Sequence, residues 1–141
     1  MKRLVVLKHI DREGPGLFAR VASEMDMHIV IVNLYLGELL PELNQSDLLL
    51  ILGGPMGVGD IGSYKYPFLS KEINYIREAI KNNISILGVC LGAQLIAFLT
   101  GGSVVKLNDK SNTSKNVAEI GWSPISFNSN ALHSLNNLHL R

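Results

Sequence analysis

The sequence predicts an α/β protein, a three-layer sandwich with a mostly parallel central sheet. Four short apolar runs, rich in β-branched residues, occupy positions 4–7, 29–32, 48–52 and 84–89. The runs are nearly continuous rather than alternating, which is typical of strands that are covered on both faces. Helical stretches lie between them, so right-handed crossovers are expected to place helices on both faces of the sheet.

Three helices are expected between and after these strands. The clearest covers residues 67–82, where apolar side chains spaced by four, three and four positions mark one face. An earlier helix covers residues 17–25 and is opened by the Gly-Pro-Gly segment at 14–16. A third runs from residue 91 to about residue 100 and is stopped by the glycine pair 101–102.

The pattern changes beyond residue 102. Residues 103–107 and 117–127 are expected to form an antiparallel excursion from the sheet, with the polar segment 108–116 as its turn. Residues 128–141 are rich in Asn, Ser and Leu and show no recognisable stop. No internal repeat, low-complexity tract or linker divides the chain, so residues 1–141 are interpreted as a single, partial domain.

Composition narrows the possible partners and the cellular location. Hydrophobic residues make up 47% and charged residues 18% of the chain, which is ordinary for a globular protein. The net charge of +1 comes without a basic stripe, so neither nucleic acid nor a membrane surface is expected as a partner. No apolar run is long enough to span a bilayer, and the start of the chain does not resemble a signal peptide. We therefore expect a cytoplasmic protein.

The chain's only cysteine, Cys90, lies where an apolar strand turns directly into a helix. Glycines at 88 and 92 leave room for a sharp turn, as in a nucleophile elbow. A helix N-terminus favours negative charge and therefore the reactive thiolate form. The alternative is a buried cysteine that acts as a small hydrophobic residue, but the two flanking glycines favour the reactive interpretation.

A glycine-rich loop at residues 53–60 follows the strand at 48–52 and should lie at the same sheet edge as Cys90. Attack of a thiolate on an amide carbonyl creates an oxyanion that needs two donors placed beforehand. The N–H groups of Leu91 and Gly54 are candidates. A plain tight turn or a phosphate-binding loop remains an alternative, although the P-loop ending and the Gly-x-Gly-x-x-Gly pattern are both missing.

Together these two loops resemble the class I glutamine amidotransferase family, and especially its GMP-synthase-like members. Order and spacing agree throughout residues 4–125. The matching pieces are His9 with 13–16, 53–56, 66–69 with Glu72, 76–79, 87–97, 101–102 and 119–122. The resemblance implies a flavodoxin-like α/β sandwich that is incomplete at its C-terminal end.

The resemblance also implies glutaminase chemistry, in which a thiolate attacks the side-chain amide of glutamine and a thioester is hydrolysed. Cys90 then takes the nucleophile's place, and Leu91 and Gly54 take those of the oxyanion donors. Gln94 matches a glutamine-contacting position, and Met56 matches a position of backbone contacts, with its side chain in packing. Neither a metal nor a cofactor is expected, and a synthase partner would receive the ammonia.

The sequence departs from the family downstream of the cysteine. The family's catalytic His and Glu lie in a His-Pro-Glu-type segment, and a His-Gly-Asp-like segment shapes the glutamine pocket; neither is present. We therefore expect little or no activity from this chain alone, and an exposed edge that favours self-association or coverage by another chain. The remaining histidines and one strand carboxylate are interpreted as structural or solvated: His9, His28, His133, His139 and Glu119.

Two other functions remain open. The first is a non-catalytic binding or assembly module on the same scaffold. The second is another cysteine hydrolase, acting on a peptide, an ester or an aldehyde adduct. Gln94 and the loop segment 53–56 argue against this second alternative, because both match the glutamine-binding pattern.

Overall fold

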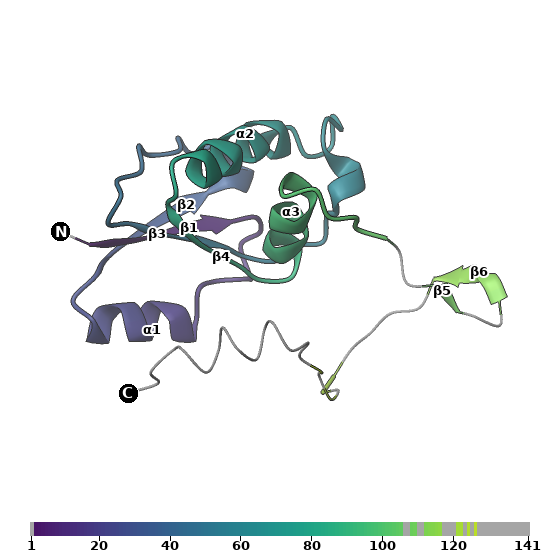
Figure 1. The fold of residues 1–141 in the computed structure, drawn as a ribbon, viewed down its shortest axis with the longest axis horizontal. Helices are drawn as coiled ribbons and strands as arrows, with labels where there is room; N and C mark the ends of the chain where they lie inside the picture. Colours follow the sequence, from purple (N-terminus) through teal and green to yellow (C-terminus); the bar gives the residue numbers. More distant parts are fainter. Residues whose placement is uncertain are drawn as a thin grey trace. The chain divides into compact units, whose positions relative to one another are not determined.

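The computed structural model describes residues 2–105, 108–109, 112–116, 121–122, 124 and 126. Four parallel strands form one sheet in the order β2-β1-β3-β4 (Figure 1). Their bounds are β1 (Arg3–Lys8), β2 (His28–Asn33), β3 (Leu48–Ile51) and β4 (Ser85–Gly88). All four expected strands are therefore confirmed.

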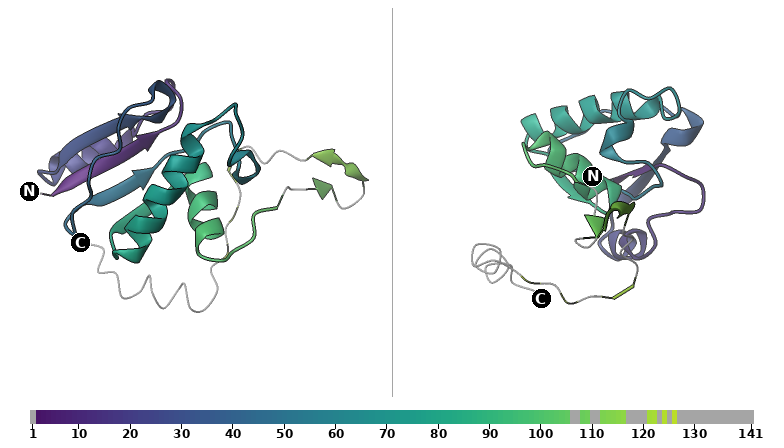
Figure 2. Two further views of the ribbon diagram at one scale, coloured as in Figure 1. Left: turned by 90° about the horizontal axis from the view of Figure 1, so that it is seen from above. Right: turned by 90° about the vertical axis from the view of Figure 1, so that its right-hand side faces the viewer.

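Helices cover both faces of this sheet, which confirms the three-layer α/β architecture. Helix α1 (Leu17–Glu24) lies on one face, while α2 (Phe68–Lys81) and α3 (Leu91–Leu99) lie on the other, as the right-hand view of Figure 2 shows. Two short 3-10 helices, η1 (Leu34–Leu36) and η2 (Val58–Asp60), follow β2 and β3. Each helix connects consecutive strands or follows the last one, as parallel pairing requires.

Alternation along β1 divides the core between the two faces of the sheet. The side chains of Val5 and Leu7 enter the larger cluster, beneath α2 and α3, whereas Leu4 and Val6 enter the smaller one, beneath α1. All four are buried. The strands therefore read as continuous apolar runs because both of their faces are covered.

Glycines set the helix ends that the sequence predicted. Gly16 precedes α1 with φ +48°, and Gly101 follows α3 with φ +87°, a conformation that is easiest for glycine. The Gly102 N–H donates to the Ala97 carbonyl at 2.7 Å, which closes the end of α3.

Strand β3 meets α3 through a very close backbone contact. A Cβ added to Gly92 would overlap the carbonyl oxygen and carbon of Ile51, at the end of β3. Because both partners are backbone, neither can swing aside. This contact fixes the height at which α3 begins above the sheet.

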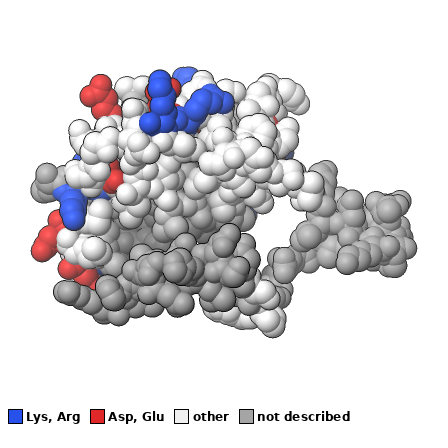
Figure 3. All heavy atoms as spheres, viewed as in Figure 1, with Lys and Arg blue, Asp and Glu red and all other residues white. Residues whose placement is uncertain are grey.

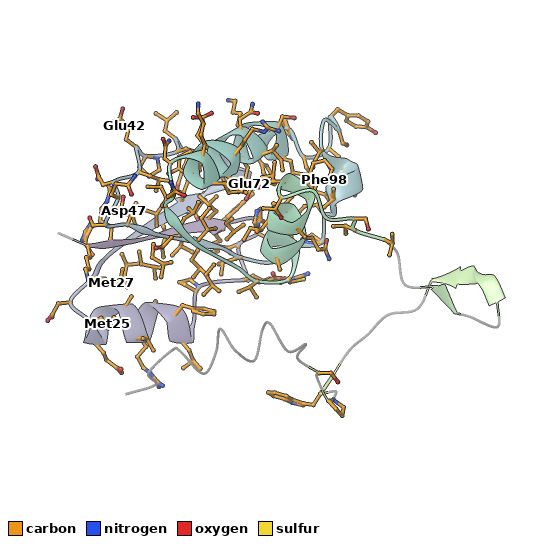
Figure 4. All side chains as sticks on the ribbon, in the orientation of Figure 1. Met25, Met27, Glu42, Asp47, Glu72 and Phe98 are labelled. Carbon is orange, nitrogen blue, oxygen red and sulfur yellow. The ribbon has the colours of Figure 1, made fainter. Side chains whose placement is uncertain are left out.

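An ion pair joins the amino ends of β1 and β3. Arg3 Nε donates to Asp47 Oδ1 at 3.0 Å, and the Asn44 N–H donates to Asp47 Oδ2 at 2.7 Å. The Asp47 side chain is fully buried, and Figure 4 shows it at this end of the sheet. The hydrogen bond from Arg3 outweighs desolvation and holds the pKa of Asp47 below its ordinary value.

The strands predicted within residues 103–127 were wrongly positioned along the sequence. Residues 103–105 are not a strand, and the predicted turn contains an antiparallel pair instead, β5 (Asn108–Asp109) with β6 (Asn112–Asn116). This pair belongs to a second compact unit, Lys106–Arg141. The strands are polar, so backbone pairing defines them, whereas the prediction followed apolar residues. Most of 117–127, with Glu119, and all of 128–141, with His133 and His139, lie outside the described residues.

Two features of the sheet edge and the helices complete the description. Within the described part of the chain, β4 pairs only with β3, so its other edge has no partner strand. No helix in that same part is long and apolar enough to cross a membrane.

Replacing Gly92 with alanine should destabilise the protein by about 2–3 kcal/mol, because the new methyl group collides with the Ile51 carbonyl. Gly59→Ala is the matched control: a Cβ there meets nothing within 4 Å, so the change should stay within about 0.5 kcal/mol. Urea unfolding followed by circular dichroism measures both. Equal stabilities of the two variants would contradict the close contact.

Asp47→Asn should lower the free energy of unfolding by about 1–3 kcal/mol at pH 6, because it removes a charged hydrogen-bond acceptor from Arg3. The folded-state pKa of Asp47 is depressed, so its contribution is complete above the unfolded value of about 3.9 and is lost as the pH falls through the folded value. Urea unfolding at several pH values should therefore show the difference shrinking towards pH 3. The exposed Asp26→Asn serves as control, and a pH-independent difference would refute this account.

Candidate active site

Cys90 occupies the turn between β4 and α3 with φ +53° and ψ −110°, an unusual conformation for a residue with a side chain. The turn is tight enough to exclude side chains on both flanks. A Cβ on Gly88 would lie 2.5 Å from the carbonyl carbon of Gly92, and one on Gly92 would overlap Ile51. The glycine pattern in the sequence therefore has a steric cause, and it holds Cys90 at the apex.

The thiol of Cys90 is exposed and stands at the start of α3. Leu91 is the first helical residue, and its side chain is buried in the core. The Leu91 N–H finds no hydrogen-bond acceptor among the described residues, as is usual in the first turn of a helix. An accessible sulfur and an unpaired donor therefore lie next to each other in the sequence.

The glycine loop passes close to the cysteine at Gly53. A Cβ on Gly53 would lie 3.3 Å from Cys90 Cβ and 3.8 Å from Cys90 Sγ. The loop and the elbow come together because the Val89 N–H donates to the Ile51 carbonyl at 2.9 Å, which extends the β3–β4 pairing up to the turn. The expected meeting of these two segments at one sheet edge is confirmed.

The neighbouring Gly54 lies in an equally crowded position. A Cβ there would lie 2.5 Å from Met56 Sδ and 3.1 Å from His9 Cβ. The Met56 side chain is buried within the larger core cluster, as the sequence analysis expected for its packing. The Gly54 N–H has no acceptor among the described residues.

A fully buried polar pair lies directly behind this loop. His9 Nδ1 is 2.9 Å from the Gly53 carbonyl oxygen, and His9 Nε2 is 2.8 Å from Glu72 Oε1. Both side chains are inaccessible to solvent. Figure 4 shows Glu72 on the side of α2 that faces the sheet. His9 is a satisfied structural histidine, as predicted, but its partner was not anticipated.

Two acidic residues of the matching segments, Glu72 and Glu13, lie at the site, although the sequence analysis gave neither of them a role there. Glu72 stands on the buried face of α2 between Leu69 and Ile73, and a carboxylate in an otherwise apolar helix face was the signal that could have revealed it. Glu13 has its Oε2 3.1 Å from the place of a Cβ on Gly53, on the part of the loop that also passes close to Cys90. Glu13 belongs to the matching segment 13–16, but that match did not predict its place beside Gly53.

Gln94 lies in the first turn of α3, where its N–H donates to the Cys90 carbonyl at 3.1 Å. The residue is half-buried, and its side-chain amide makes no hydrogen bond to the described residues. It is therefore placed close to the cysteine along the helix, with an amide group that is available to a ligand.

A cavity of about 620 Å³ opens beside the site, between the start of α2 and the segment that follows β2. Cys90 does not line it, whereas His9 and Met56 do, so the cavity borders the glycine loop but does not include the thiol. Its walls are mainly apolar and aromatic, with Lys65 and Lys71 at the side of α2.

Basic side chains are unevenly distributed over the two helices on this face of the sheet. In Figure 3 the basic side chains gather over α2, while the surface over α3 shows none, in keeping with a helix that contains no charged residue. Within the described ranges, no group of three His, Cys, Asp or Glu side chains could hold a metal ion.

The sequence of this chain is similar to known proteins of one family. A family model described as glutamine amidotransferase class-I matches residues 17–133. The glutamine amidotransferase-like protein YfeJ of Salmonella typhimurium is 29% identical over 125 residues, which are 87% of this chain and 49% of that protein. A glutamine amidotransferase-like protein of Acanthamoeba polyphaga mimivirus, L716, is 33% identical over 81 residues, covering 57% and 38% of the two chains.

Solved structures show the same fold. A glutamine amidotransferase from Thermotoga maritima superposes with a TM-score of 0.66 at 32% identity, over 74% of this chain and 45% of that one. A glutamine amido transferase from Methylobacillus flagellatus superposes with a TM-score of 0.64 at 25% identity, over 75% of this chain and 41% of that one. The chain thus spans about half the length of the proteins that it matches, or less.

Iodoacetamide should label the folded protein at Cys90 with one equivalent, because the thiol is exposed and the sequence contains one cysteine. Gly53→Ala should slow this reaction several-fold, since its methyl group would stand against the Cys90 side chain. Gly57→Ala, where a Cβ meets nothing within 4 Å, should leave the rate unchanged. Intact-mass spectrometry over time gives the rates; identical rates for Gly53→Ala and the parent would rule out the crowding.

Proposed function

Because the chain belongs to the class I glutamine amidotransferase family, we propose that it carries a glutaminase site in which Cys90 is the nucleophile. The observation that carries this proposal is the exposed thiol at the β4–α3 turn, close to the glycine loop after β3. The site is assigned to the GMP-synthase-like group because segments 53–56, 66–69 and 87–97 follow its pattern.

The proposed reaction begins when the Cys90 thiolate attacks the side-chain amide carbon of glutamine. The C–S bond forms, the carbonyl π electrons move to oxygen, and the oxyanion accepts hydrogen bonds from the N–H groups of Leu91 and Gly54. The tetrahedral intermediate then expels the amide nitrogen, which gains a proton and leaves as ammonia. Water hydrolyses the resulting thioester to glutamate and restores the thiol.

Two further residues are proposed to bind the substrate. The half-buried amide of Gln94, one helical turn from the cysteine, contacts the glutamine. The backbone of Met56 supplies further contacts from the loop, while its side chain stays in the core. The released ammonia would pass to a synthase domain or a separate synthase partner.

The 141-residue polypeptide by itself is proposed to turn over glutamine slowly or not at all, because the described residues place no histidine for proton transfer at the site. His9 has both ring nitrogens engaged, by Gly53 and Glu72. His28 pairs with Arg3 at the amino end of the sheet, whereas Cys90 follows the carboxyl end of β4. Neither of these two described histidines is therefore placed to protonate departing ammonia.

A diazo-ketone analogue of glutamine should label Cys90, and glutamine should protect the thiol, because this electrophile needs the nucleophile and the binding groups but no general acid. Cys90→Ala should remove labelling. Gln94→Ala should abolish the protection by glutamine while iodoacetamide still labels the thiol. Peptide mass spectrometry locates the label, and a glutamate assay run in parallel should show little release.

The other outcomes separate the alternatives. Labelling at the rate of an ordinary thiol, without protection by glutamine, would contradict the glutaminase proposal and favour a non-catalytic binding module. Protection by a peptide, ester or aldehyde instead of glutamine would favour another cysteine hydrolase. Rapid glutamate release would overturn the expected inactivity of the isolated chain.

A further inference from the structure

We propose that His9 and Glu72 form a positioning pair, which holds the peptide group between Gly53 and Gly54 so that the Gly54 N–H faces the oxyanion formed at Cys90. The inference deepens the glutaminase function proposed above and rests on it. Its basis is the 2.9 Å hydrogen bond between His9 Nδ1 and the Gly53 carbonyl, together with the burial of the pair behind the loop.

The direction of the Gly53 carbonyl decides the direction of the Gly54 N–H. In a trans peptide these two groups point to opposite sides, and no described peptide bond is cis. Because the carbonyl points at the His9 ring, the N–H points away from it. Gly53, which supplies the carbonyl of this peptide, lies close to Cys90, because a Cβ on it would stand 3.3 Å from Cys90 Cβ.

A Gly-Gly peptide needs an external anchor because its own chain restrains it weakly. Glycine accepts backbone angles that other residues avoid, so a peptide between two glycines can flip at little cost. Larger residues are disfavoured in this loop, because their Cβ atoms would crowd neighbouring side chains. A Cβ on Gly53 would lie 3.1 Å from Glu13 Oε2, and one on Gly54 would lie 2.5 Å from Met56 Sδ.

The hydrogen bond from His9 to Gly53 does not depend on which member of the pair, His9 or Glu72, holds the proton between them. A carbonyl oxygen only accepts hydrogen bonds, so His9 Nδ1 must carry a proton and donate a hydrogen bond to the Gly53 carbonyl. One further proton lies between His9 Nε2 and Glu72 Oε1, at a separation of 2.8 Å. Whether that proton belongs to an imidazolium or to a glutamic acid, the bond to Gly53 is retained.

The composition of the pair fits a positioning role better than packing alone. Glu72 Oε2 is buried with no hydrogen-bond partner among the described residues. Such an oxygen destabilises the fold, and an apolar pair of similar size would fill the space without that penalty. The carboxylate instead binds His9 through one oxygen and sets the ring that holds the loop.

Two double variants test the anchor while the core stays filled. His9→Leu with Glu72→Leu removes the hydrogen bond and the buried acid together, a replacement that folded proteins commonly tolerate. His9→Asn with Glu72→Leu differs only at position 9 and restores a side-chain N–H close to the place of Nδ1. His28→Leu, at an exposed histidine in β2, is the matched control.

The first readout compares two reactions of Cys90. The 4-nitrophenyl ester of the glutamate γ-carboxyl acylates the thiol through an oxyanion and loses 4-nitrophenolate without needing a general acid; iodoacetamide alkylates the thiol with loss of iodide and forms no oxyanion. The Leu/Leu variant should acylate about 100-fold more slowly, whereas its alkylation should change less than about twofold. The Asn/Leu variant should recover about tenfold in acylation. His28→Leu should match the parent in both reactions.

The second readout follows the Gly54 amide resonance in ¹⁵N-labelled protein. It should be sharp in the parent and in Asn/Leu, and broadened by exchange in Leu/Leu. Acylation and alkylation that fall together, or a Gly54 resonance equally sharp in all variants, would overturn the positioning role. If the ester acylates the parent no faster than it acylates free cysteine, the glutaminase proposal fails, and the Gly54 resonance still decides whether the pair anchors the loop.

Discussion

The contact between Gly92 and the Ile51 carbonyl is the constraint on which the site depends. It presses the first turn of α3 onto the end of β3, at a distance that only a residue without a side chain permits. Gly53 follows Ile51 by two positions and Cys90 precedes Gly92 by two, so the same contact sets the loop beside the thiol. The close backbone contact between the end of β3 and the start of α3 therefore determines both the packing of the fold and the geometry of the site.

A second tie connects elements that this contact does not reach. His9 follows β1, Gly53 follows β3, and Glu72 belongs to α2, so the buried pair links the central strand, the glycine loop and the covering helix. The cavity beside the loop includes His9 in its wall. The His9 ring therefore belongs both to the cavity wall and to the hydrogen bond with the Gly53 carbonyl.

The sequence predicted the strands and helices that depend on local sequence patterns. Strands and helices followed from apolar periodicity and glycine stops, and the meeting of Cys90 with the loop followed from the parallel sheet. The antiparallel pair of β5 and β6 was missed because its strands are polar. The His9–Glu72 contact was also missed, since it spans 63 positions and leaves no periodic trace. Only the carboxylate on the buried face of α2 hinted at it.

The balance of stability explains why this contact belongs to the site. An isolated carboxylate in a core is costly, and an unsatisfied oxygen costs about 1–3 kcal/mol. The core behind the loop is otherwise apolar, with Leu69, Ile73 and Ile76 on the same helix face, so packing alone requires no acid there. The glycine loop gains from an outside donor, because its Gly-Gly peptide is weakly restrained by its own chain and side chains at Gly53 and Gly54 would be crowded. The polar pair therefore anchors the loop and lowers the stability of the core. Such a loss is expected where geometry at a reactive group outweighs stability.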